Sequence, residues 1–147
     1  MRIAVVLLLL AGSASAKPKL ERIEDGDVEL LAPVGWDASL SPWKVDVKQP
    51  KGEAYLSLAA YASTGDIEVL IDRTLPGAKH KRHKGWTCAE GKTDDERWRL
   101  AVCARATEGV IVLVGMSASP KLYKSLGGAQ MVLKVAQSAK GMRPQEK

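Results

Sequence analysis

WTCAEGKTDDERWRLAVCARA, residues 86–106, is the stretch that decides the fold of this chain. Two strand-like segments, 86–90 and 97–106, flank a polar turn at 91–95. In the second segment apolar and basic residues alternate, as they do in a strand with one buried and one wet face. The stretch therefore predicts an antiparallel β-hairpin.

Cys88 and Cys103 are the only cysteines of the chain. Pairing them centres the hairpin between Asp95 and Glu96, close to the position that the turn residues indicate. An even pair of cysteines in an exported domain most often forms one structural disulfide. The alternatives are a redox-active pair, which usually has C-x-x-C spacing, and a metal site, which needs more ligands than two thiols. We expect the structural disulfide.

The first sixteen residues have the build of a secretory signal peptide. Arg2 precedes an apolar run, and the segment ends in Ala14-Ser15-Ala16, a typical small-residue cleavage site. The apolar run is shorter than the roughly 20 residues that span a bilayer. We therefore expect an exported chain without a transmembrane span, located in the periplasm or secreted.

The total charge and length define the class of protein. Loss of Arg2 with the signal peptide lowers the formal net charge from +5 to +4, which is a weak bias toward anionic partners. This excess is too small for a dedicated nucleic-acid binder. We expect a flexible lead at 17–26, a single domain at 27–142 and a flexible tail at 143–147.

Apolar patterns predict the other elements. Five further strands are expected, at 27–32, 37–40, 43–48, 54–62 and 110–116. Ser63 is expected to cap a short amphipathic helix in which Leu70 is the position least tolerant of Asp. Ser119-Pro120 opens a long C-terminal helix, which Gly127-Gly128 can break or kink. This order predicts an α+β domain with a mostly antiparallel sheet.

The layout resembles that of the PsbP-like superfamily, which includes periplasmic proteins of the DcrB type. The resemblance rests on an early strand that runs into Pro33-Val34-Gly35-Trp36, on a capped helix after the next strand pair, and on a last helix that carries VLKVAQS at 132–138. It implies an antiparallel sheet flanked by helices and a non-enzymatic binding or accessory role. It carries over no functional residue.

Six consecutive residues form the most unusual local composition of the chain, and we term them the basic segment: Lys79, His80, Lys81, Arg82, His83 and Lys84. We expect them in a loop that binds a sulfated or phosphorylated glycan, a lipid headgroup or an acidic protein face. Histidines gain charge in mildly acidic solution, which strengthens anion binding. The alternative is a solvated connection. Arg97, Arg99 and Arg105 either extend this patch or form a wet face of the sheet.

The tryptophans divide into two pairs. Trp43 and Trp98 are in phase with the aliphatic faces of their predicted strands, so we expect both in the core. Trp36 follows a turn and Trp86 follows the basic segment, so we expect both to be partly exposed. Trp86 is the aromatic residue that we select as a candidate partner contact.

His80 and His83 are the only histidines. Two imidazoles three residues apart can share a metal ion, but a third ligand such as Glu90 or Asp72 is then required. The spacing does not demand such a site, and we expect no metal and no cofactor. No nucleophile motif such as G-x-S-x-G is present.

The sequence thus favours an exported, non-enzymatic binding or accessory protein of the cell envelope or extracellular space. Its partner would be a protein or an anionic surface met through the basic segment. One alternative is a small hydrolase or metal-dependent enzyme that uses His80 and His83. The other is a structural subunit of a larger envelope assembly, which an exposed apolar patch would support.

Overall fold

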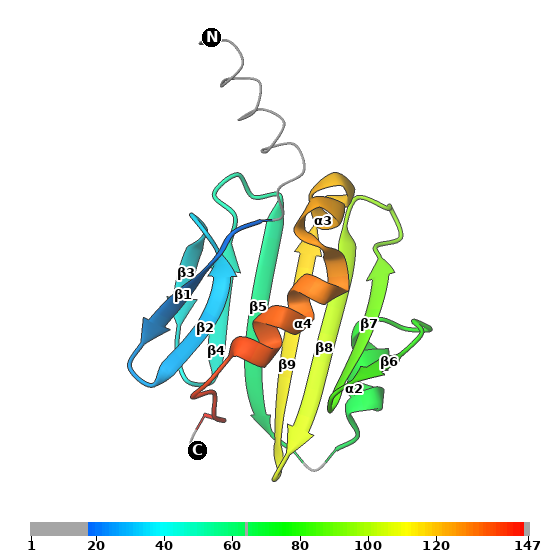
Figure 1. Cartoon of the computed structure of the whole chain (residues 1–147). Coiled ribbons are helices and arrows are strands. Elements are labelled where there is room, and N and C mark those ends of the chain that lie inside the picture. Colours follow the sequence, from blue (N-terminus) through cyan, green and yellow to red (C-terminus); the bar gives the residue numbers. More distant parts are fainter. Residues whose placement is uncertain (1–17, 64, 146–147) are drawn as a thin grey trace.

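A seven-stranded antiparallel sheet forms the centre of the computed structural model, which describes residues 18–63 and 65–145 (Figure 1). In spatial order its strands are β3 (Asp37–Leu40), β4 (Lys44–Lys48), β5 (Ala54–Ala62), β9 (Val110–Ala118), β8 (Arg99–Thr107), β7 (Trp86–Lys92) and β6 (Lys81–His83). Every neighbouring pair is antiparallel. The predicted α+β class is confirmed.

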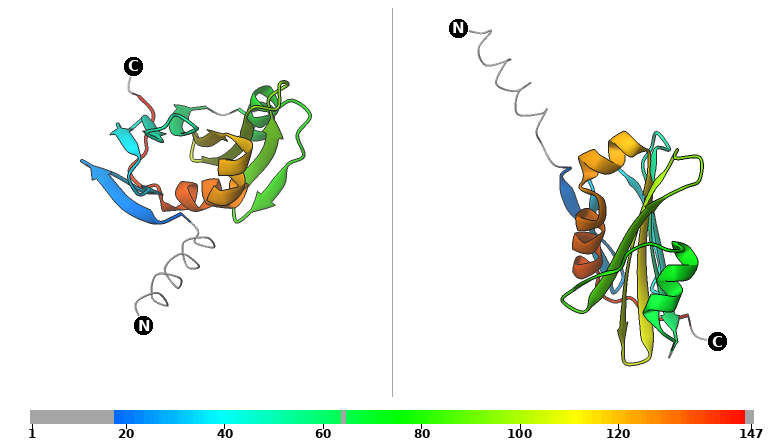
Figure 2. Two further views of the ribbon diagram at one scale, coloured as in Figure 1. Left: turned by 90° about the horizontal axis from the view of Figure 1, so that it is seen from above. Right: turned by 90° about the vertical axis from the view of Figure 1, so that its right-hand side faces the viewer.

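The two faces of the sheet are covered differently (Figure 2). Helices α3 (Pro120–Leu126) and α4 (Gly128–Ser138) and the ribbon of β1 (Leu20–Asp25) and β2 (Val28–Pro33) lie on one face. Helix α2 (Ile67–Thr74) lies on the other face, over β7 and β8. Since α2 spans only part of that face, the outer side of β4 and β5 is left uncovered.

The larger core lies beneath α4. Val45 and Val47 of β4 and Leu56 and Leu58 of β5 are fully buried there, as the period-two pattern of these strands predicts. A smaller core lies beneath α2 and centres on Ile71, which is also fully buried. The prediction that Leu70 is the critical position of this helix is wrong, because Leu70 is only partly buried.

Strand β1 was not predicted. Leu20–Asp25 lies in the segment that we expected to be a flexible lead, and it pairs with β2 along its whole length. Most of its side chains are charged and exposed, so apolar and polar residues do not alternate along it. The sequence pattern therefore does not predict a strand here. Pairing with β2 and the contact of Ile23 with the larger core hold it in place.

The helix termini differ from the expected ones. Asp66, rather than Ser63, caps α2, with its carboxylate accepting a hydrogen bond of 2.8 Å from the Glu68 N–H. The expected long C-terminal helix is divided into α3 and α4 at Gly127, which has a φ of 102°. This left-handed conformation ends α3 and changes the direction of the chain.

The hairpin of β7 and β8 has the predicted register. Cys88 lies directly opposite Cys103, and the two form a disulfide. The centre of the hairpin therefore falls between Asp95 and Glu96. Within residues 18–63 and 65–145, no helix is long and apolar enough to cross a membrane. The predicted signal peptide lies outside the described residues.

Candidate functional site

The middle of the basic segment forms an edge strand where a loop was expected. Lys81–His83 is β6, the last strand of the sheet, and it pairs only with β7 in the described chain. The two strands are joined by Lys84-Gly85, whose φ angles of 48° and 86° suit a tight two-residue hairpin. The sequence did not reveal the strand, because Lys-Gly is not a strong turn signal and three residues show no periodicity.

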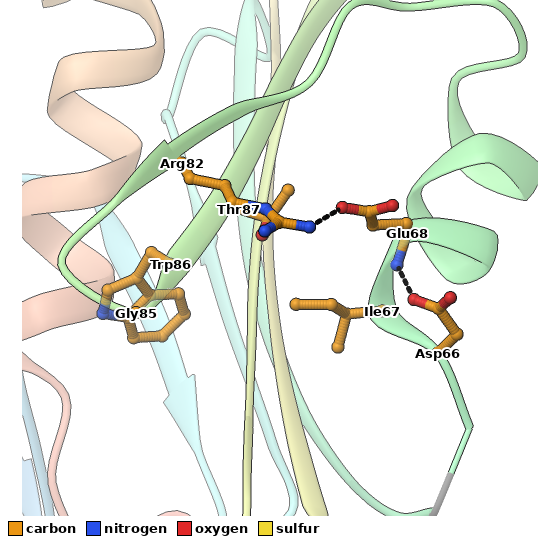
Figure 3. Close-up of a pocket in the computed structure, with 7 residues that line it drawn as sticks. All are labelled: Asp66, Ile67, Glu68, Arg82, Gly85, Trp86 and Thr87. Atoms are coloured by element: carbon orange, nitrogen blue, oxygen red, sulfur yellow. Dashed lines mark hydrogen bonds and ion pairs between the residues drawn. The ribbon is translucent and has the colours of Figure 1, made fainter.

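The alternation of a strand sends Arg82 to the face that α2 covers. There the Arg82 guanidinium donates a hydrogen bond to the Glu68 carboxylate (Figure 3). This hydrogen bond and the negative charge of Glu68 raise the pKa of Arg82. The shallow pocket at this site, about 340 Å³, thus contains a cation that already has its counter-ion.

Lys81 and His83 lie on the opposite face, beside α4. A groove of about 580 Å³ separates this helix from the sheet edge, and we term it the β6–α4 groove. It is lined by Lys81, Arg82, His83, Cys88, Glu90, Gly127, Ala129, Gln130, Leu133, Lys134 and Gln137. The sequence did not indicate the contribution of α4, since Lys134 lies about fifty positions from the basic segment and only the packing of α4 brings it near.

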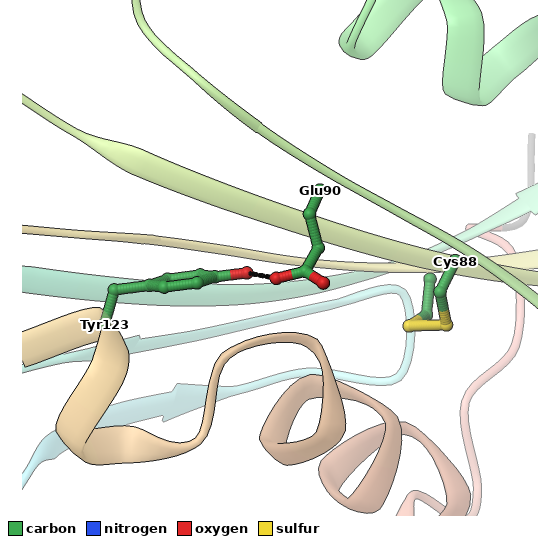
Figure 4. The surroundings of a disulfide bond; sticks show 4 residues. Cys88, Glu90 and Tyr123 are labelled. Carbon is green, nitrogen blue, oxygen red and sulfur yellow. Dashed lines mark hydrogen bonds between the residues drawn. A yellow bond between two sulfur atoms is a disulfide. The ribbon is translucent and has the colours of Figure 1, made fainter. Parts of the chain in front are cut away.

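The groove has an excess of positive charge. In the part of the chain that the structure describes, Lys81, His83 and Lys134 take part in no ion pair. Glu90 is the one carboxylate in the lining, and it accepts a hydrogen bond from the Tyr123 hydroxyl (Figure 4). Burial, followed by this hydrogen bond, raises the pKa of Tyr123, so the phenol remains a donor to Glu90.

The Cys88–Cys103 disulfide, drawn in Figure 4, joins a cysteine that lines the groove to a cysteine of the core. Cys88 lines the groove and is 8% exposed, whereas Cys103 is fully buried. Lys81 is the cross-strand neighbour of Cys88. The disulfide therefore links β8 to β7, the strand that pairs with β6.

The two histidines do not converge. His80 Nε2 lies 2.9 Å from Asp72 Oδ1 of α2, whereas His83 lines the groove on the α4 side. Of the two carboxylates considered as a third ligand, Asp72 accompanies His80 and Glu90 shares the groove with His83. Among the described residues, no group of three or more His, Cys, Asp or Glu side chains is placed to hold a metal ion.

Several predicted surface residues lie elsewhere. Trp86 is only 2% exposed, so the expectation that it is partly exposed is wrong. The guanidinium of Arg105 covers the indole ring of Trp86, with its carbon 4.9 Å from the ring centroid. Arg97 lies in the hairpin turn with Asp95, and Arg99 lies at the start of β8. None of the three arginines lines the groove.

The tryptophans predicted for the core are not fully buried. Trp43 is 42% exposed, because it lies in a bend before β4 and the alternation of the strand does not extend to it. Trp98 is partly buried and precedes β8. Trp36, which was expected to be partly exposed, is partly buried and packs against the larger core.

Solved structures with this arrangement of strands and helices are known. The solution structure of cyanobacterial PsbP (CyanoP) from Synechocystis sp. PCC 6803 matches with a TM-score of 0.55 and 15% identity, over 84% of this chain and 93% of that one. A crystal structure from Bacteroides thetaiotaomicron VPI-5482 matches with a TM-score of 0.53 and 11% identity, over 90% of this chain and 50% of that one. The chain thus spans half the length of the second protein.

Comparison by sequence alone finds no matching family model and no matching curated protein. The chain has a PsbP-like fold, as the resemblance of its layout implied. At these identities the likeness concerns the fold only.

Proposed function

We propose that this chain is an exported, non-enzymatic binding or accessory protein of the cell envelope or extracellular space. Its β6–α4 groove holds an anionic group of the partner. The observation that carries the proposal is that Lys81, His83 and Lys134 share one groove without an ion-pair partner among the described residues. The neighbouring cations differ, since Arg82 is paired with Glu68 and His80 with Asp72.

The other residues of the groove suit the same role. Gln130 and Gln137 supply amide groups that donate hydrogen bonds to the oxygens of an anion, and Ala129 and Leu133 form an apolar wall. A groove with a low-dielectric wall concentrates the field of its cations and screens them less than a flat surface does. Such a site attracts anions more strongly than three scattered lysines.

Export is supported by two independent features. Residues 1–16 have the composition of a signal peptide, and the Cys88–Cys103 disulfide persists in an oxidising compartment. The PsbP-like fold supports the binding or accessory role through the resemblance described above. The enzyme alternative receives no such support, because His80 and His83 lie on different faces of the sheet edge.

Fluorescence anisotropy with labelled polyglutamate and polyphosphate tests the proposal. The measurement uses the oxidised chain beginning at Lys17, at pH 6 and low salt. One variant replaces the groove cations, Lys81→Gln, His83→Gln and Lys134→Gln. Its matched control replaces three exposed lysines elsewhere, Lys19→Gln, Lys51→Gln and Lys121→Gln.

We expect the groove variant to bind either polyanion at least about 10-fold more weakly, because three cations at roughly 0.5 kcal/mol each are lost. The control should stay within about 2-fold of the parent, since its lysines contribute only to the net charge. Raising the salt concentration should weaken the binding of the parent. Equal losses in the two variants, or no binding by the parent, would contradict the proposal.

An exposed aromatic surface favours a second candidate, a structural subunit of an envelope assembly. Trp43 and Tyr61 are 42% and 47% exposed, and they line a shallow depression of about 640 Å³ at the uncovered end of β4 and β5. Exposed aromatic residues are enriched in protein interfaces. Cross-linking in intact cells tests this candidate, because Trp43→Ser with Tyr61→Ser should abolish cross-linked products that the groove variant retains.

A further inference from the structure

Strand β6 leaves one side of the sheet open. It is the last strand in the order β3–β4–β5–β9–β8–β7–β6, and its only neighbour in residues 18–63 and 65–145 is β7. An edge strand has backbone N–H and C=O groups directed away from its neighbour, and these can pair with an added strand. All three residues of β6 are exposed.

The charges of this edge select among possible added strands. Natural proteins place short, charged strands at sheet edges because such strands discourage pairing with other chains. Lys81 and Arg82 are cationic, and histidines such as His83 gain charge in mildly acidic solution. The strand therefore repels a basic strand and disfavours a neutral one, but it attracts an acidic one. The charges of β6 therefore disfavour pairing with most extended segments and favour pairing with an acidic one.

The position of each cation specifies the pattern of that class. Lys81 and His83 face the β6–α4 groove, where Lys134 and Gln137 form the opposite wall. Arg82 borders both this groove and the pocket beside α2, and its guanidinium is paired with Glu68 of α2. Since the side chains of an added strand also alternate between the faces, acidic residues are favoured on the groove side and are not required on the side of Arg82.

We infer that the partner presents an extended segment with acidic residues at alternate positions, which adds to the sheet beside β6 and directs its carboxylates into the β6–α4 groove. This inference rests on the proposed function and specifies its partner as an acidic protein segment. The apolar wall of Ala129 and Leu133 contacts the aliphatic stems of those side chains. Backbone hydrogen bonds supply affinity and the groove supplies selectivity.

Three peptides of equal length and charge test the inference by fluorescence anisotropy with the oxidised chain. The first has Glu and Thr in alternation. The second has the same composition with all glutamates contiguous. The third is the alternating peptide with N-methyl groups on alternate backbone nitrogens, which removes hydrogen-bond donors and keeps the charge. Hydrogen exchange of the β6 amides is measured with each peptide and with polyphosphate.

We expect the alternating peptide to bind at least about 10-fold more tightly than the N-methylated one, because backbone hydrogen bonds are lost. It should also bind more tightly than the contiguous peptide and slow exchange of the β6 amides, which polyphosphate should not do. Lys81→Glu should weaken binding by about 5-fold or more, because an attraction is replaced by a repulsion, whereas Lys51→Glu, on the exposed turn after β4, should leave binding nearly unchanged. Both substitutions are at exposed positions, and thermal unfolding verifies that both variants fold.

The remaining outcomes separate the two claims. If the three peptides bind equally through the groove cations, strand addition is overturned and the proposed function stands. If neither the peptides nor polyphosphate binds, the proposed function fails. If vesicles rich in phosphatidylglycerol bind through Lys81 and Lys134 more tightly than any peptide, a lipid surface replaces the acidic segment and the inference is overturned.

Discussion

At the scale of single residues, the surroundings of a side chain decide its role more than its type does. The basic segment illustrates this. Arg82 and His80 are paired with Glu68 and Asp72 of α2, whereas Lys81 and His83 face a groove without counter-ions. Four adjacent basic residues thus have two different environments. For Lys81, Arg82 and His83 the alternation of β6 explains the difference.

The disulfide contributes mainly to stability. Cys88 and Cys103 are separated by 15 residues, and closing a loop of this length stabilises the folded chain by about 3 kcal/mol in the chain-entropy description. We expect Cys88→Ala with Cys103→Ala to lower the free energy of unfolding by that amount in urea denaturation. A reductant should destabilise the parent similarly and leave the variant unchanged. An unchanged midpoint for the reduced parent would contradict this expectation.

The stability at alkaline pH depends on Tyr55. Burial, then the hydrogen bond and charge of Asp46, raise the pKa of Tyr55 from 10.0 to about 12. Because the pKa is higher in the folded chain, the protonated phenol stabilises the fold fully below pH 10 and progressively less toward pH 12. We expect the free energy of unfolding to fall across this interval in urea denaturation.

The variant Tyr55→Phe isolates this effect. Its free energy of unfolding should fall less steeply over the same pH interval. Some decrease should remain, because the pKa of Tyr123 is also raised in the folded chain. Tyr61→Phe is the matched control, since Tyr61 has no hydrogen-bond partner like Asp46 among the described side chains. Identical slopes for the parent and Tyr55→Phe would refute the role of Tyr55.

At the scale of elements, α2 and the α3–α4 pair position the two sides of the sheet edge. Helix α2 supplies the counter-ions of Arg82 and His80, and α4 supplies the far wall of the groove. Both helices are attached through apolar contacts with the sheet. Changes in this packing therefore affect the environment of the basic segment.

The attachment of α2 depends on Ile71 more than on Leu70. Ile71 is fully buried against Val102 and Ala104 of β8, so Ile71→Ala should cost about 2–4 kcal/mol of unfolding free energy. Leu70→Ala should cost clearly less, because Leu70 is partly exposed. Urea denaturation of both variants compares them, and the reverse order would contradict the packing described here.

The break between α3 and α4 depends on Gly127. Its φ of 102° is unfavourable for a side chain with a Cβ atom. We expect Gly127→Ala to lower the free energy of unfolding by about 1–2 kcal/mol. Gly127→Asn should cost less, because asparagine tolerates the left-handed region. Thermal or urea unfolding of the two variants measures the difference, and a stabilised alanine variant would indicate a continuous helix.

At the scale of the whole molecule, a wide sheet is covered incompletely on both faces. Helix α4 stops short of β6, which creates the groove, and α2 leaves the outer side of β4 and β5 uncovered. The ribbon of β1 and β2 completes the layer beside α4 (Figure 1). The groove and the uncovered side of β4 and β5 thus exist because the helices do not extend over the whole sheet.

The contribution of β1 to the whole fold is testable by truncation. A chain that begins at Asp27 lacks β1, its backbone hydrogen bonds to β2 and the contact of Ile23 with the core. We expect it to lose about 2 kcal/mol or more of unfolding free energy, since each backbone hydrogen bond contributes roughly 1 kcal/mol. A chain that begins at Pro18 should match one that begins at Lys17. Equal stability of all three would show that the segment is a dispensable lead.

The sequence by itself determined the α+β class, most of the strands and the register of the β7–β8 hairpin. These features are encoded locally, because period-two alternation and turn residues act between near neighbours, and the cysteine pair adds one cross-strand constraint. The order of the elements was also sufficient to indicate the PsbP-like fold. The basic segment was visible as a candidate site, although its shape was not.

The tertiary structure alone decided which residues are covered. Trp86 is buried and Trp43 exposed, contrary to their patterns, because burial depends on the reach of other elements over the sheet. Strand β1 exists through its pairing with β2, and Lys134 joins Lys81 and His83 only because α4 packs across the sheet. A local pattern specifies how a segment is folded, whereas a groove depends on distances between segments far apart in the chain.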